Sequence, residues 1–124
     1  MKLEVEVMNL KFPWMRTELI ESLEELGDPM QQEKEWLPGA GALDRIIHFL
    51  FDDTPLPQNA LGYYLRSVEE VEAVGEVQQA LDDLLTVHGN DLSDHEYIRQ
   101  TEWPRVVEGA RKALRLLNAP EVTR

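Results

Sequence analysis

Apolar side chains recur at helical spacing along most of this chain. The first clear run lies between Pro13, which suits the first turn of a helix, and Gly27, a common C-terminal stop. Within it, apolar side chains stand three or four residues apart, at Met15, Leu19, Leu23 and Leu26. The spacing predicts an amphipathic helix over residues 13–26.

Shorter segments follow in the middle of the chain. Asp28 and Pro29 resemble a helix cap and a first-turn proline, and they predict a second helix that the loop 38–41 ends. Residues 43–50 have helical spacing, although their apolar end also fits a buried strand. A proline-rich turn at 52–57 and a short helix at 58–65 complete this part of the chain.

The second half of the chain predicts the longest helix and the last one. Ser67 and Glu70 match a capping box in front of an apolar stripe that runs to Gly89. Ser93 and Glu96 repeat the capping pattern before a brief turn. Thr101 is the expected cap of a last helix, with Pro104 in its first turn.

Residues 1–12 alternate in part, with Leu3, Val5 and Val7 separated by glutamates. The pattern fits a short β-strand or an extended arm. Such a strand could pair with a second molecule, which would make the chain a structural or regulatory subunit of a dimer. We therefore expect a mainly α, compact bundle of about five to six helices. A short N-terminal strand is possible in addition to it. The length fits one domain over residues 1–124, with its helical core at 13–118.

Composition narrows the classes of function. The chain has no cysteine, which excludes disulfides and thiolate chemistry. Its net charge of −12 opposes binding to nucleic acid or to anionic membranes and favours a basic protein partner. The chain shows neither a long apolar run nor a signal-like start, so a cytoplasmic location is expected.

The strongest charge feature is the stretch 67–98, which contains no lysine or arginine. We predict that its acidic residues form a docking surface for a basic partner: Glu69, Glu72, Glu76, Asp82, Asp83, Asp91 and Asp94. The cations of the last helix, Arg105 and Lys112 among them, offer the alternative that the two segments neutralise one another. A solvated acidic face without a partner is the third interpretation.

Candidate chemistry is sparse. His48 and Asp52 stand four residues apart, a spacing that would place them on one helix face, and with Asp53 they could support acid/base or metal-assisted catalysis. No further ligands complete a metal motif, so a histidine held by a carboxylate for structural reasons is the commoner outcome. We expect no catalytic residues, no metal and no cofactor, and we predict that the chain is not an enzyme.

Three short strings resemble a family of small acidic bacterial proteins, most of them uncharacterised. The strings are HFLFDDT at 48–54, EVEAV at 70–74 and WPRVV at 103–107. Proteins of this kind also resemble immunity proteins of contact-dependent growth inhibition and related polymorphic toxin systems. The resemblance, over roughly residues 13–118, implies a cytoplasmic protein that neutralises one cognate toxin by tight binding. It supplies no catalytic residues.

Overall fold

The computed structural model describes residues 9–36, 41–55 and 57–119. In this part of the chain six α-helices are joined by one π-helical turn, η2, and one 3₁₀ turn, η3. In chain order the elements are α1 (Pro13–Leu26), α2 (Pro29–Glu35), α3 (Ala42–His48), η2 (Phe49–Asp53), η3 (Pro57–Asn59), α4 (Val68–His88), α5 (Asp94–Tyr97) and α6 (Trp103–Leu117). The expectation of a mainly α fold is confirmed.

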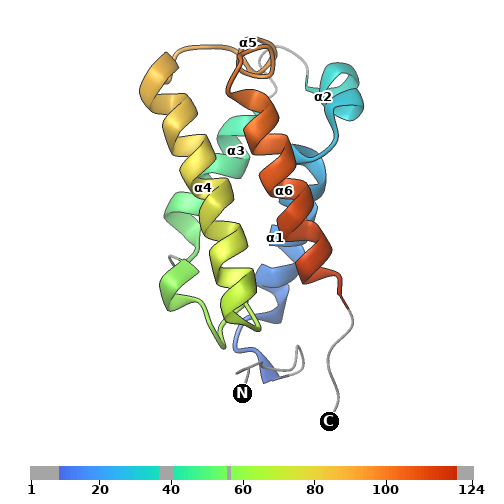
Figure 1. Ribbon diagram of the computed structural model, residues 1–124, viewed down its shortest axis with the longest axis vertical. Helices are drawn as coiled ribbons and strands as arrows, with labels where there is room; N and C mark the ends of the chain where they lie inside the picture. The colour runs from blue at the N-terminus through green and yellow to red at the C-terminus, as the bar shows by residue number, and fades with distance from the viewer. Residues whose placement is uncertain (1–8, 37–40, 56, 120–124) are drawn as a thin grey trace.

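Three long helices form the body of the molecule. In Figure 1, α4 and α6 lie side by side and run in opposite directions, and α1 lies behind α6. The short helices α2 and α5 lie at the upper end of the view, where α1 and α4 end and α6 begins. The lower end therefore brings together the starts of α1 and α4 and the end of α6.

The core is made by the apolar stripes of these helices. Leu19 and Leu23 of α1, Val77 and Leu81 of α4, and Val106 of α6 are completely buried in one continuous cluster. Fully burying an aliphatic side chain stabilises the folded state by about 1.5–3 kcal/mol, so the stripes predicted from spacing supply much of the driving force. Within the described residues, no helix has the length and apolar composition needed to cross a bilayer.

The helix starts follow the sequence signals in most places. Asp28 caps α2 by accepting a hydrogen bond from the amide of Gln31, and Ser93 with Glu96 forms a complete capping box on α5. Ser67 caps α4, but the predicted capping box is incomplete. The Glu70 side chain accepts a hydrogen bond from the Arg66 amide instead of from the Ser67 amide. The prediction for α6 is wrong by one residue, because Glu102 rather than Thr101 precedes the helix, with Pro104 in its first turn.

The segment after α3 differs from the prediction. The helix does not stop before Asp52 but widens into the π-helical turn η2, whose Leu50 carbonyl accepts hydrogen bonds from the side chains of Gln78 and Thr54. In a regular α-helix a backbone amide would donate to this carbonyl. Because the two side chains donate to it instead, the wide turn is stable although it is buried. The short helix expected at 58–65 is the 3₁₀ turn η3 followed by a tight turn with a bridge between Leu61 and Leu65.

The predicted N-terminal strand falls mostly on residues 1–8, which lie outside the described residues. Residues 9–12 are described and contain no strand. The amides of Lys11 and Phe12 donate to the carbonyls of Gly62 and Tyr63, at 3.0 and 2.7 Å. This end of the segment therefore pairs with a turn of its own chain.

A buried glutamine connects the helices at the upper end of the fold. The Gln32 side-chain amide donates to the carbonyls of Glu25 and Leu26, at 2.8 and 2.9 Å, and its oxygen accepts from the Trp103 indole at 3.0 Å. Trp103 also meets Trp36 edge to face. One side chain of α2 thus satisfies the last carbonyls of α1 and holds the start of α6.

We expect Gln32→Ala to lower the free energy of unfolding by roughly 2–4 kcal/mol, because it leaves two carbonyls and one indole N–H buried without partners. The neighbouring Gln31 is exposed, and its side chain donates to the exposed Glu35. Gln31→Ala keeps the backbone amide that Asp28 caps, so it should cost about 0.5 kcal/mol or less. Urea unfolding of both variants compares the two costs. Equal losses would contradict the role given to Gln32.

Candidate functional site

The most elaborate polar site in the described chain is a buried ion cluster at the lower end of the bundle. Arg16 comes from the first turn of α1 and Glu70 from the first turn of α4. The two side chains form a bidentate pair, with Nη1 to Oε1 and Nη2 to Oε2 both 2.8 Å. Their exposed side-chain fractions are 4% and 2%, so water has almost no access to the pair.

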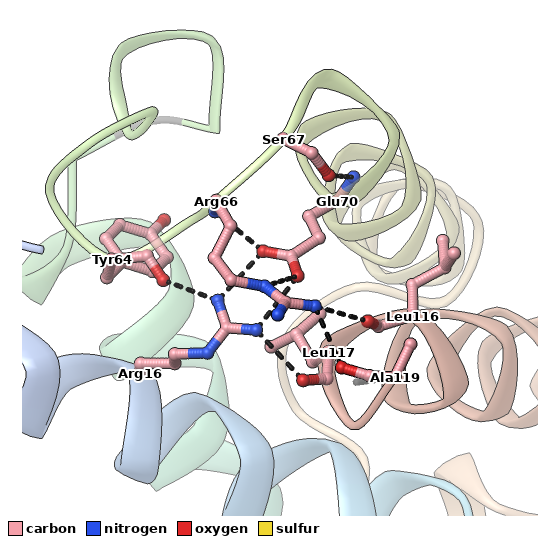
Figure 2. Close-up of polar contacts among 8 residues, drawn as sticks. All are labelled: Arg16, Tyr64, Arg66, Ser67, Glu70, Leu116, Leu117 and Ala119. Atoms are coloured by element: carbon pink, nitrogen blue, oxygen red, sulfur yellow. Dashed lines mark hydrogen bonds and ion pairs between the residues drawn. The ribbon is translucent and has the colours of Figure 1, made fainter. Parts of the chain in front are cut away.

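A second arginine completes the cluster. Arg66, just before α4, donates to Glu70 from both its backbone amide, at 2.7 Å, and its Nε, at 3.0 Å. Figure 2 shows the two guanidinium groups converging on the Glu70 carboxylate, with the end of α6 beside them. Both arginines also donate to backbone carbonyls: Arg16 to those of Tyr64 and Leu117, and Arg66 to those of Leu116 and Ala119.

Charge balance explains this arrangement. Burial alone raises the pKa of the Glu70 carboxyl, but the hydrogen bonds and charges of Arg16 and Arg66 outweigh it, so this pKa lies below its ordinary value of 4.5. The second guanidinium faces the carbonyl end of α6, where the helix dipole is negative. The Glu70 carboxylate and both guanidinium groups have their hydrogen-bond partners within the protein, so the cluster joins α1, α4 and α6 and offers no binding surface.

We expect Glu70→Gln to lower the free energy of unfolding by roughly 3–5 kcal/mol at pH 7, because both buried guanidiniums lose their counter-charge. Glu72→Gln, on the exposed face of the same helix, is the matched control and should change it by about 0.5 kcal/mol or less. Because the pKa of Glu70 is lower in the folded state, its contribution is full above pH 4.5 and is lost as pH falls through the folded value. Urea unfolding from pH 7 to pH 3 should therefore show a smaller acid loss in Glu70→Gln, and parallel pH curves would contradict this account.

The predicted acidic docking residues do not form one unpaired surface. Glu76 and Asp83 of α4 pair with cations of α6, Lys112 at 3.1 Å and Arg105 at 2.5 Å. The Arg105 hydrogen bond lowers the pKa of Asp83, with help from Gln79. For these two residues the alternative of mutual neutralisation between the two helices is what the structure shows.

The other predicted docking residues are spread more widely. Glu72 and Asp82 are exposed on α4, and Glu69 is half-buried at its start. Asp91 is exposed in the turn after α4, and Asp94 is half-buried, where it accepts a hydrogen bond from the amide of Leu43 at 3.4 Å. The carboxylates that keep an open surface therefore lie at several places along α4 and in the following turn.

The histidine pair predicted on α3 is present. His48 Nδ1 lies 2.7 Å from Asp52 Oδ2, and His48 Nε2 lies 3.7 Å from Asp44. The hydrogen bond to Asp52 and then the charge of Asp44 raise the pKa of His48 above 6.5. Asp53, the third predicted member, lines a different hollow beside α1. In the described chain no group of three or more acidic or histidine side chains is placed to hold a metal ion.

We expect NMR titration of the imidazole protons to give His48 a pKa above 6.5, and Asp52→Asn to bring it down, because the carboxylate hydrogen bond is the main cause of the shift. Asp53→Asn removes one carboxylate from the same turn but no hydrogen bond to His48. It should therefore lower this pKa by a smaller amount. Equal effects of the two substitutions would point to general charge rather than to the pair.

The fold and site define an all-α protein held together by a buried ion cluster, with an acidic surface. The chain belongs to the family described as a domain of unknown function, DUF7945, whose pattern matches residues 10–123. No curated protein and no solved structure matches the chain.

Proposed function

We propose that this chain is a protein-binding domain that neutralises a basic partner protein, and that it is not an enzyme. The observation that carries the proposal is that surface cations pair with carboxylates of the same chain. Arg45, Arg99, Arg105 and Lys112 each contact a carboxylate of this same chain. Each pair uses one positive and one negative charge, so pairing leaves the net charge of the molecule at −12.

Two features of this surface favour a basic partner. The first is the field of the excess charge, which accelerates encounter with a positively charged protein. The second is that the surface ion pairs are weak, about 0–1 kcal/mol each. A partner's cations can therefore displace Arg105 or Lys112 of α6 from the α4 carboxylates with which they pair. Glu72 and Asp82 stand open on the same helix, and we assign the docking surface to them together with Glu69, Glu76, Asp83, Asp91 and Asp94.

The finer form of the proposal concerns the partner. The sequence resemblance to immunity proteins would make it a cognate toxin, bound in the cytoplasm and blocked by occlusion. Acid/base catalysis by His48, Asp52 and Asp53 is less favoured, because His48 is 61% exposed and Asp53 faces another hollow. Catalytic groups are usually held in sites that exclude water.

The test is affinity capture with the full chain at low and high salt, followed by kinetics with the captured protein. We expect one basic protein that binds more weakly at high salt. Glu72→Lys combined with Asp82→Lys should slow its association by about tenfold, because steering depends on charge near the docking surface.

The matched control is Glu24→Lys combined with Glu35→Lys, two exposed positions on α1 and α2 that change the net charge equally. A smaller effect of the control would locate the docking surface on α4. Association that is indifferent to salt and to both double variants would refute the electrostatic proposal.

A further inference from the structure

A hollow of about 310 Å³ opens where α3, the end of α4 and α5 meet. Figure 1 places these elements toward the upper end of the bundle, away from the ion cluster. The hollow includes part of the predicted docking surface, since Asp94 is in its wall.

The floor of the hollow is aliphatic. Ile47, Leu85 and Leu92 line it and are partly buried against the core, with the buried Leu43 and Tyr97 beside them. These side chains keep apolar surface in contact with water in the isolated chain. Covering that surface is favourable for any group that fits, at about 25 cal/mol per Å².

The rim of the hollow is acidic. Asp44, with an exposed side-chain fraction of 79%, and Asp94 stand in the wall. His48 lies beside Asp44, at 3.7 Å, and the described residues that line the hollow include no lysine or arginine. The hollow between α4 and α6 differs, because its lining mixes the cations Arg105, Lys112 and Arg115 with Glu76 and Glu108. An aliphatic floor with carboxylates at its edge complements a ligand that is apolar at its tip and positively charged beside it.

The walls are fixed before any ligand arrives. The Tyr97 hydroxyl donates to the Gly89 carbonyl at 2.5 Å, which ties α5 to the end of α4. Asp94 accepts from the amide of Leu43, which ties α5 to the start of α3. A preformed hollow loses little conformational entropy on binding, which favours its use as a docking point.

We propose that this hollow receives a segment of the basic partner protein that presents an aliphatic side chain next to a lysine or arginine. The aliphatic group covers Ile47, Leu85 and Leu92, and the cation pairs with Asp44 and Asp94. The inference rests on the proposed function and adds to it the chemistry of the partner's contact. A second copy of this chain fits less well, because two molecules with a charge of −12 repel one another.

The experiment selects twelve-residue peptides from a random phage library on the full chain and measures the binding of the selected peptides to variants. We expect sequences with an aliphatic residue beside lysine or arginine. Asp44→Lys and Ile47→Ala should each weaken their binding by about fivefold to tenfold, as the loss of a central contact does. Asp44 is so exposed that its substitution leaves the fold intact even if Ile47→Ala loosens it.

Two matched controls stand outside the lining. Glu24→Lys, at an exposed position of α1, repeats the charge change of Asp44→Lys, and Val87→Ala shortens an apolar side chain that is 62% exposed. Both should leave peptide binding within about twofold, as substitutions away from a contact do. Selected peptides without the aliphatic and cationic pair, equal losses in variants and controls, or no binder at all would overturn the inference. So would a dimer of the chain that Asp44→Lys dissociates, since it would put a second copy in the hollow.

The captured partner separates this inference from the proposed function. If Glu72→Lys with Asp82→Lys slows its association while Asp44→Lys and Ile47→Ala leave its affinity unchanged, the hollow is not the contact and the proposed function stands. If the hollow variants weaken binding as well, both hold. If neither set has an effect, both fail.

Discussion

The Glu70 carboxylate, held between two buried guanidinium groups, is the constraint on which the fold depends most. Its ligands come from the first turn of α1 and from the residue before the Ser67 cap of α4, and the arginines in turn hold the last carbonyls of α6. Losing α1 would remove one of the two counter-charges of the buried Glu70, and losing α6 would leave buried arginine donors without acceptors. Buried charged groups without their partners cost several kcal/mol. At the other end Gln32 joins three helices in the same manner without charge. The bundle is thus fastened by polar groups at both ends and filled by apolar stripes between them.

The helices were predictable because burial is periodic, and the exceptions have local causes. In the wide turn η2 the Leu50 carbonyl accepts a local hydrogen bond from Thr54 and a second one from Gln78, 28 residues away, which no local pattern reveals. The Glu70 side chain does not complete the capping box because it binds the buried guanidinium groups of Arg66 and Arg16 instead. A sequence signal for the cluster did exist: Arg16 and Glu70 both stand in apolar stripes, where a charged side chain must find a buried partner.

The acidic stretch shows the limit of reading charge along a chain. Residues 67–98 contain no lysine or arginine, yet Lys112 and Arg105 come alongside from α6 and neutralise Glu76 and Asp83. The spacing of His48 and Asp52 was enough to predict their contact, because both stand on one helical turn and its continuation. The hollow between α3, α4 and α5 had no signal of its own, since its lining comes from segments up to 54 residues apart that only the fold brings together, from Leu43 to Tyr97. The partner, the toxin connection and the compartment stay predictions.

The contacts of Arg16 with the end of α6 span 101 residues of chain. During synthesis on the ribosome, α1 and α4 emerge long before the carbonyls that satisfy this arginine, so the lower end of the bundle cannot close until α6 has left the exit tunnel. Contacts between such distant segments also slow folding, because the loop must be closed before the contact stabilises it. Until α6 emerges, the nascent chain exposes the apolar stripes of α1 and α4, and its high negative charge keeps neighbouring unfinished copies apart.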